Sequence, residues 1–110
     1  MEKWGVYNVN LGEGVANEQS YSRPCIALMI DEALGICIEI PLTSNLDASR
    51  FSNTIRLPKD DKNNLRDESV AMLFHVRSIS VRRISVRPIG MINEPQREKI
   101  KEGLRFMLDI

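Results

Sequence analysis

The chain has 110 residues, of which 43% are hydrophobic and 27% are charged, with 15 Lys plus Arg against 15 Asp plus Glu. This length predicts a single domain over residues 1–110 with one modest core. The zero net charge argues against a globally basic nucleic-acid binder, although it still allows a local basic strip. No stretch approaches the ~20 apolar residues of a membrane span, and the first residues do not read as a signal peptide. Two cysteines do not make a disulfide framework. We therefore expect a cytoplasmic protein with no membrane contact.

The first half of the chain predicts three strands, at about 3–11, 25–30 and 36–44. The second is a continuous apolar run, which is typical of a buried strand, and the third alternates and is β-branched. Between the first two lies a loop with two glycines and no periodicity, and a turn separates the second from the third. Cys25 and Cys37 lie inside the apolar runs, so we expect both to be small buried hydrophobes.

The second half predicts shorter elements: a short helix or loop near 46–50 and strands at 52–57, 69–79 and 89–92. Residues 81–85 nearly repeat residues 76–80, which indicates a turn or short helix rather than a repeat array. The polar stretch between the strands at 52–57 and 69–79 contains Asp60 and Asp61, which we interpret as a solvated loop.

The C-terminal residues change to a helical period. Asn93 is a candidate N-cap, with Pro95 in the first turn and Gln96 at the capping-box spacing. One apolar face is then formed by Ile100, Leu104, Met107 and Leu108. Gly103 costs such a helix ~1 kcal/mol relative to Ala, so packing must hold it. Five or six short strands and one helix predict a mainly β fold, a small curled sheet or barrel with a C-terminal α-helix.

Several kinds of catalytic site are excluded by composition. His75 is the single histidine, so neither a two-histidine ribonuclease arrangement nor a multi-imidazole metal site is available. No acidic pair has metal-loop spacing, no phosphate-binding glycine motif is present, and we expect no metal and no cofactor.

Two other places are more suggestive, because functional groups are commonly built where strands end beside loops. Arg23-Pro24 comes just before the buried strand, and Pro24 keeps Arg23 extended. Thr43-Ser44 comes at the end of the next strand. Composition alone favours a structural role for the first and a turn for the second.

A set of short motifs favours a functional role for these residues instead. Their order is Trp4-Gly5-x-Tyr7-x-Val9, Glu18-Gln19-x-x-x-Arg23-Pro24, Pro41-Leu42-Thr43-Ser44, Ser69-Val70-Ala71, Val76-Arg77-Ser78-Ile79 and Ile89-Gly90. Together they resemble the MazF/PemK (Kid) family, the toxins of type II toxin–antitoxin pairs. The resemblance implies a homodimeric SH3-like barrel that cuts single-stranded RNA at short sequences without metal and is neutralised by a cognate antitoxin.

The resemblance also implies roles for residues. Arg23 and Thr43 correspond to the catalytic pair of the family, with Ser44 beside them, and Glu18 and Gln19 correspond to a loop that covers the RNA. The sequence departs from the family pattern at Met72, Leu73, Phe74 and His75. Glu18, through its loop, and His75, because an imidazole suits proton transfer near neutral pH, are both candidates for the acid–base group. A structural role for His75 is the alternative.

RNA contacts are expected from a strip of cations without acids among them: Arg77, Arg82, Arg83 and Arg87. A solvated face, partly paired with the acidic loop, is the alternative. Tyr21 and Phe51 are candidates for stacking on bases, whereas Trp4 and Phe106 are expected in the core. Two other functions remain open: a CcdB-like inhibitor of DNA gyrase without enzymatic activity, and an RNA-binding module that does not cleave.

Overall fold

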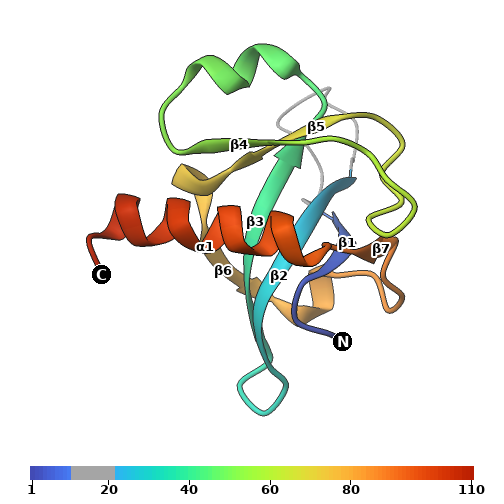
Figure 1. The fold of residues 1–110 in the computed structure, drawn as a ribbon. Helices are drawn as coiled ribbons and strands as arrows, with labels where there is room; N and C mark the ends of the chain where they lie inside the picture. Colours follow the sequence, from blue (N-terminus) through green and yellow to red (C-terminus); the bar gives the residue numbers. More distant parts are fainter. Residues whose placement is uncertain (11–21) are drawn as a thin grey trace, which may run out of the picture.

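The computed structural model describes residues 1–10 and 22–110, and there the chain forms a curled antiparallel sheet with one C-terminal helix. Figure 1 shows the sheet wrapping on itself while the helix crosses it. The strands are β1 Gly5–Asn10, β2 Ser22–Asp31, β3 Ile36–Thr43, β4 Thr54–Leu57, β5 Ser69–Met72, β6 Arg77–Ser80 and β7 Gly90–Met91, and the helix is α1 Glu94–Leu108. Short 3₁₀ turns cover Leu46–Arg50, Leu73–His75 and Val81–Arg83. The predicted mainly β fold is confirmed.

Strand β3 organises the sheet because it changes neighbours along its length. One edge pairs with β2 as far as Cys25 opposite Pro41. The other edge pairs with β6 over residues 36–39 and then with β5 at Leu42 and Thr43. Beyond Pro41, β3 therefore continues with β5, while the start of β2 continues with β1, where Arg23 lies opposite Val9. The sheet opens between β2 and β3 at this point.

The strand predicted at 69–79 is interrupted. It forms β5 and β6, separated by the 3₁₀ turn Leu73–His75. Every residue from 69 to 73 is buried, which a strand that alternates between core and solvent cannot achieve. The turn carries Leu73 into the core and then exposes Phe74 and His75. Sequence periodicity missed this bend because the hydrophobic pattern stays apolar across it.

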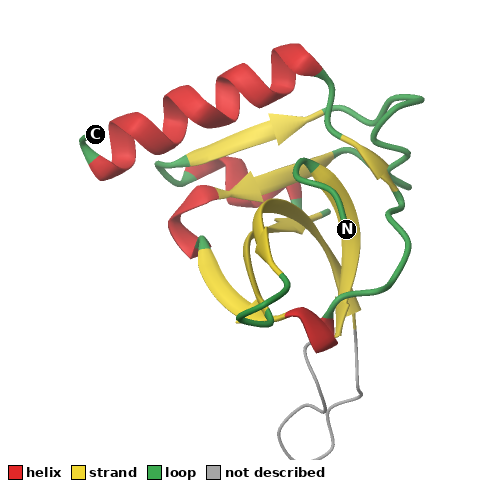
Figure 2. Ribbon diagram, turned by 90° about the horizontal axis from the view of Figure 1, so that it is seen from below, coloured by secondary structure: helices red, strands yellow, loops and turns green. Residues whose placement is uncertain are grey.

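Helix α1 starts at the predicted N-cap, but the Gln96 side chain does not complete a capping box, since its Oε1 has no hydrogen-bond partner among the described residues. The Gln96 backbone N–H donates to Asn93 Oδ1 at 2.9 Å, and Pro95 lies in the first turn. Figure 2 shows the helix lying along one side of the sheet next to β4. The helix is able to approach because Gly103 has no side chain: a Cβ there would lie 2.5 Å from Leu73 Cδ1 and 3.3 Å from Ile55 Cδ1. The residue that weakens the isolated helix is thus the one that lets it pack.

The predicted core is right in most positions and wrong at the end of the helix. Trp4 is 7% exposed and Ile100 is fully buried, as expected. Phe106, however, is 86% exposed and Leu108 is 51% exposed, although Leu104 and Met107 from the same turns pack against the core. Phe106 points away from the face that Ile100, Leu104 and Met107 form, because each residue advances the helix by ~100°. The expectation of a core Phe106 and of an apolar face reaching Leu108 is therefore wrong.

The loop before β5 is more structured than a solvated acidic stretch. Asp60 is half-buried, and its Oδ1 accepts from the backbone N–H groups of Lys62 and Asn63, at 2.9 and 2.7 Å. Its Oδ2 accepts from Asn93 Nδ2 at 2.8 Å, which ties the loop to the start of α1. The solvated interpretation is confirmed for the exposed Asp61 and wrong for Asp60.

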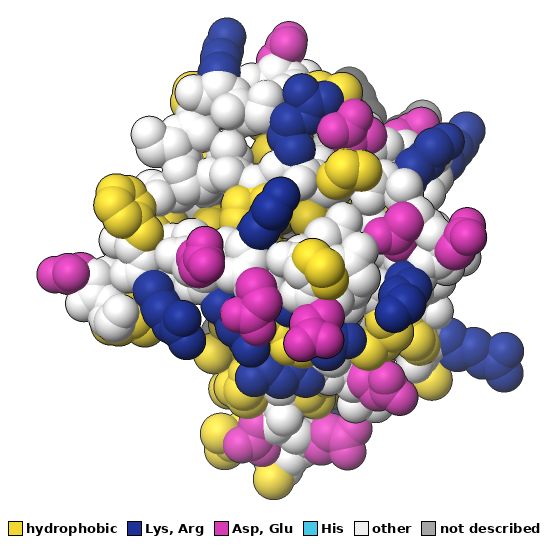
Figure 3. All heavy atoms as spheres, viewed as in Figure 1, with side chains coloured by type: hydrophobic (Ala, Val, Ile, Leu, Met, Phe, Trp, Pro, Cys, Tyr) yellow, Lys and Arg dark blue, Asp and Glu magenta, His cyan; other side chains and the backbone are white. Residues whose placement is uncertain are grey.

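No helix among residues 1–10 and 22–110 is long and apolar enough to cross a bilayer. Acidic and basic side chains are interspersed over the face that carries α1, without a patch of one sign (Figure 3). This mixture matches the zero net charge of the chain.

Candidate active site

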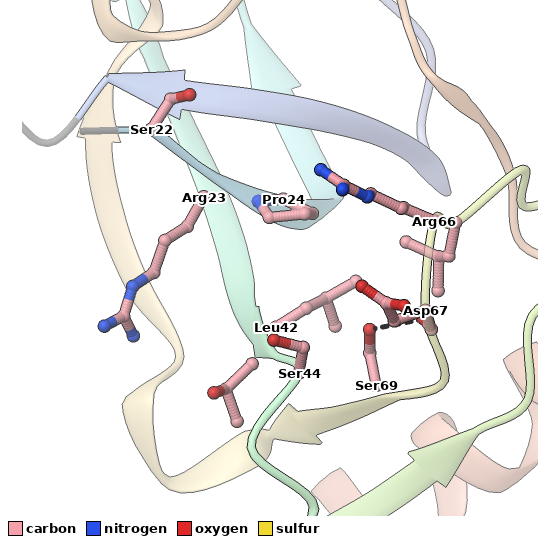
Figure 4. Close-up of a pocket in the computed structure, with 10 residues that line it drawn as sticks. Ser22, Arg23, Pro24, Leu42, Ser44, Arg66, Asp67 and Ser69 are labelled. Carbon is pink, nitrogen blue, oxygen red and sulfur yellow. Dashed lines mark hydrogen bonds between the residues drawn. The ribbon is translucent and has the colours of Figure 1, made fainter.

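A pocket of about 320 Å³ opens where β2 and β3 separate. Its size is at the small end of the range for small-molecule sites. Three chain segments line it, and Figure 4 shows their side chains: Ser22, Arg23 and Pro24 from the start of β2, Leu42, Thr43 and Ser44 from the end of β3, and Leu65, Arg66, Asp67 and Ser69 from the segment that enters β5. Leu42 and Leu65 are buried, so the floor is apolar and the rim is polar.

Arg23 reaches this pocket because of where its strand begins. It is the second residue of β2, paired with Val9 of β1, and its side chain is exposed. Pro24, which follows it, also lines the pocket and is half-buried. The sequence interpretation placed Arg23 between a loop and a buried strand, and that placement is confirmed.

Thr43 and Ser44 reach the pocket from the other strand. Arg23 and Thr43 each lie two residues beyond the last β2–β3 pair, Cys25 with Pro41. The Thr43 Oγ1 accepts from the Asn45 backbone N–H at 3.1 Å, which fixes the oxygen and leaves the hydroxyl proton available to a ligand. Ser44 is exposed beside it. The structure therefore brings together all three residues that the resemblance named as the catalytic group.

The segment entering β5 was missed by sequence reasoning. Arg66 and Asp67 belong to a polar stretch that looked like an ordinary loop, and only the pairing of β5 with β3 brings them to the pocket. No local signal in the sequence marks them. A second guanidinium and a carboxylate thus belong to the site, opposite Arg23 (Figure 4).

The other predicted site residues divide into two groups. Glu18, Gln19 and Tyr21 lie outside the described residues. The second group consists of predicted site residues that the structure describes and that do not line the pocket: His75, Arg77, Arg82, Arg83 and Arg87.

The residues outside the pocket have varied surroundings. The His75 ring is exposed and lies 4.5 Å from the Phe74 ring, centroid to centroid. Phe51, the second stacking candidate, is 52% exposed and contacts Phe74 edge-on at 6.4 Å. Arg82 and Arg83 form the 3₁₀ turn after β6.

Among the described residues, Arg77 is the arginine of this strip that forms a salt bridge. Its Nε donates to Glu39 Oε1 at 2.7 Å, and the Glu39 side chain is fully buried while that of Arg77 is 45% exposed. Burial raises the pKa of Glu39, and the hydrogen bond and charge of Arg77 act in the opposite direction. Glu39 Oε2 is buried with no hydrogen-bond partner among the described residues. Arg77 therefore compensates a buried carboxylate, whatever else it contacts.

Cys25 and Cys37 are both buried, as the sequence predicted. Desolvation is the main reason that their pKa values rise, well above the usual range for Cys25 and to about 11 for Cys37, and Glu39 adds to the effect. A thiol that stays protonated is a poor nucleophile. Neither cysteine lines the pocket in the described part of the chain.

The pocket combines guanidinium groups, hydroxyls and one carboxylate, which is a set suited to a phosphate ester. Guanidinium groups bind phosphate oxygens through several donors, and hydroxyls donate to the remaining oxygens. In the described ranges, no three His, Cys, Asp or Glu side chains gather as potential metal ligands.

A family model described as "PemK-like, MazF-like toxin of type II toxin-antitoxin system" matches residues 2–108. No curated protein matches the sequence at a significant level. The family match covers nearly the whole chain, including β1 and α1.

Solved structures share the fold. The MazE–MazF complex of Deinococcus radiodurans aligns with a TM-score of 0.79 at 16% identity, over 100% of this chain and 96% of that one. The Mycobacterium tuberculosis toxin MazF-mt6 aligns with a TM-score of 0.72 at 16% identity, over 96% and 97% of the two chains. An endoribonuclease in complex with its cognate antitoxin from a mycobacterial species aligns with a TM-score of 0.73 at 13% identity, over 100% and 96%.

Proposed function

The chain belongs to the family of PemK-like, MazF-like toxins of type II toxin–antitoxin systems, and on that premise we propose that it cleaves single-stranded RNA at short sequences. The observation that carries the proposal is the convergence of Arg23, Thr43 and Ser44 on one pocket from two different strands. These are the residues that the family motifs mark, and their chemistry suits a phosphodiester.

The reaction needs no group beyond those of the substrate and the protein. The ribose 2′-hydroxyl attacks the adjacent phosphorus, the bond to the 5′ oxygen breaks, and the products are a 2′,3′-cyclic phosphate and a 5′-hydroxyl. Negative charge accumulates on the phosphoryl oxygens in the transition state. Donors fixed where that charge develops accelerate the reaction because they need no reorganisation.

We assign Arg23 to the stabilisation of this negative charge. An arginine side chain stays protonated, so it is a poor base and a good multi-donor clamp for the phosphoryl oxygens. Thr43 holds the scissile phosphate through its hydroxyl, whose oxygen the Asn45 N–H already orients. Ser44 assists from the exposed rim.

We propose two protein contacts for the toxin. The first is a cognate antitoxin with an acidic segment, which the arginine-bearing pocket would hold in place of RNA; MazE–MazF and the mycobacterial endoribonuclease were solved with antitoxins. The second is a copy of the same chain. Exposed apolar side chains near the end of α1 and the 3₁₀ turns support self-association: Phe51, Phe74, Phe106, Leu108 and Ile110. The proposed location is the cytoplasm.

The test is cleavage of a mixed single-stranded RNA pool in the presence of EDTA, followed by sequencing of the 5′-hydroxyl ends. We expect cleavage at a short consensus, with cyclic phosphates on the upstream fragments. Arg23→Ala should lower the rate by ~100–1000-fold while the melting temperature stays close to that of the wild type, because Arg23 is exposed. An undiminished rate in Arg23→Ala would refute the assignment of Arg23.

A further inference from the structure

The segment entering β5 is held at both ends, so that two charged residues must face the pocket. Leu65 is buried, and its backbone N–H donates to Asn63 Oδ1 at 3.0 Å. Ser69 is buried too, and its Oγ donates to the Asp67 carbonyl at 3.0 Å. Between these two anchors Arg66 and Asp67 are exposed and line the pocket.

The Asp67 carboxylate holds no part of the described fold together. Within the described residues it makes no ion pair and no side-chain hydrogen bond, whereas its neighbour Glu68 pairs with Arg56 Nε at 3.0 Å. Figure 4 shows Asp67 reaching from the segment before β5 toward the end of β3, with Arg23 on the far side of the pocket. The other charged residues lining the pocket in the described ranges are Arg23 and Arg66.

A carboxylate in a phosphate pocket needs an explanation, because it repels the ligand that the two arginines attract. Phosphodiester cleavage by a 2′-hydroxyl provides one: the nucleophile must lose a proton, and the arginines cannot take it. A carboxylate at hydrogen-bond distance from that hydroxyl is a suitable acceptor. In the described residues Asp67 is the single Asp, Glu or His that lines the pocket.

We propose that Asp67 is the general base of the RNA cleavage described above, so this inference rests on the proposed function. The Asp67 carboxylate takes the proton of the 2′-hydroxyl as the 2′ oxygen bonds to phosphorus and the bond to the 5′ oxygen breaks. The departing 5′ oxygen takes a proton from water, and the proton on Asp67 then returns to solvent. Arg23 and Arg66 face the phosphate that separates this nucleophile from its leaving group.

The test uses a short RNA carrying the cleavage sequence found in the pool experiment, with 2′-O-methyl groups everywhere except at the cut site. Single-turnover rates are measured across pH for the wild type, for Asp67→Asn and for Glu68→Gln, the matched loss of the adjacent carboxylate. We expect Asp67→Asn to be slower by ~100–10,000-fold and to lose the acidic limb of the pH–rate profile. Glu68→Gln should keep both the rate and the profile.

Two further measurements separate a base from a residue that binds or positions. A fully 2′-O-methylated RNA cannot be cut, and Asp67→Asn should bind it at least as tightly as the wild type, because a repelling charge is gone. A substrate whose 5′ leaving oxygen is replaced by sulfur needs no proton on the leaving group. It should not rescue Asp67→Asn, since the defect lies at the nucleophile.

Each contrary outcome has a separate meaning. If the wild type cuts the RNA and Asp67→Asn cuts it equally fast, or if the thio substrate restores the rate, Asp67 is not the base and the endoribonuclease proposal stands. If Asp67→Asn cuts the unmodified RNA pool at a different sequence and keeps the wild-type pH profile on the short RNA, Asp67 recognises a nucleobase instead. If the wild type leaves every RNA in the pool intact, both the proposed function and the role of Asp67 fail.

Discussion

Replacing Arg77 by methionine should destabilise the protein strongly, because it strands a carboxylate in the core. Glu39 is fully buried and its one ionic partner in the described part of the chain is Arg77. Removing one partner of a buried pair costs ~3–5 kcal/mol. Solvent already screens Arg77, which is 45% exposed, so we expect the lower end, about 3 kcal/mol. For a domain of this size, this corresponds to a fall in melting temperature of about 12 °C.

The loss in free energy of unfolding caused by Arg77→Met should increase with pH. Burial raises the pKa of Glu39 above its ordinary value of 4.5, and losing Arg77 raises it further. The stability that the neutral carboxyl provides is fully present below 4.5 and is lost as the pH rises through the higher pKa of the folded state. Relative to the wild type, Arg77→Met should therefore be least impaired near pH ~4.5 and most impaired near pH ~7.5.

Urea unfolding of both proteins at the two pH values measures this difference. The control is Glu39→Gln in the Arg77→Met background, which removes the charge and should restore most of the lost free energy of unfolding at neutral pH. A deficit that is the same at both pH values, or that Glu39→Gln leaves unchanged, would show that the pair does not act as a buried charge and its counter-ion.

Two further predictions concern the pocket and the sheet. Thr43→Val should slow RNA cleavage by ~100–1000-fold in a single-turnover assay. It should lose only ~1 kcal/mol in the free energy of unfolding, because it loses the hydrogen bond from Asn45. Thr43→Ser should keep most of the rate, and a fully active Thr43→Val would remove the hydroxyl from the mechanism. Gly90→Ala should cost ~2–3 kcal/mol in urea unfolding, because its Cβ would meet backbone carbonyls of residues 62–63. Gly35→Ala, with φ of +71° and open space around it, should cost only the ~1–2 kcal/mol of a left-handed backbone, so equal losses in both variants would contradict the contact argument.

The sequence predicted the features that depend on local pattern. The apolar run at 25–30 and the capping residues of α1 each determine their own conformation, and both are confirmed. The break at Leu73–His75 was not predictable in this way, because it results from the consecutive buried residues 69–73, which only the packed sheet requires. Phe106 was misassigned because its aromatic side chain was expected in the core, although the helical period places it on a different face from Ile100, Leu104 and Met107.

The candidate site shows the same division. Arg23, Thr43 and Ser44 were singled out because they lie at strand ends and in short motifs that resemble those of a known family, whereas Arg66 and Asp67 carry no motif. Their position follows from tertiary structure, since β3 exchanges β2 for β5 beyond Pro41 and the segment before β5 must then cross the opening. The role of this polar loop can be inferred only when the pairing partner of the following strand is known.

The residues proposed for catalysis are also different from those on which the stability of the core depends. Arg23, Ser44, Arg66 and Asp67 are exposed around a floor of buried leucines, and the charge on which the core depends lies elsewhere, at Glu39. Substitutions at exposed positions usually change the free energy of unfolding by less than ~0.5 kcal/mol. A pocket variant that loses cleavage and keeps its melting temperature therefore reports on the reaction itself. A pocket variant that unfolds would instead show that the rim contributes to the fold, and the assignment of its residues to catalysis would lose its support.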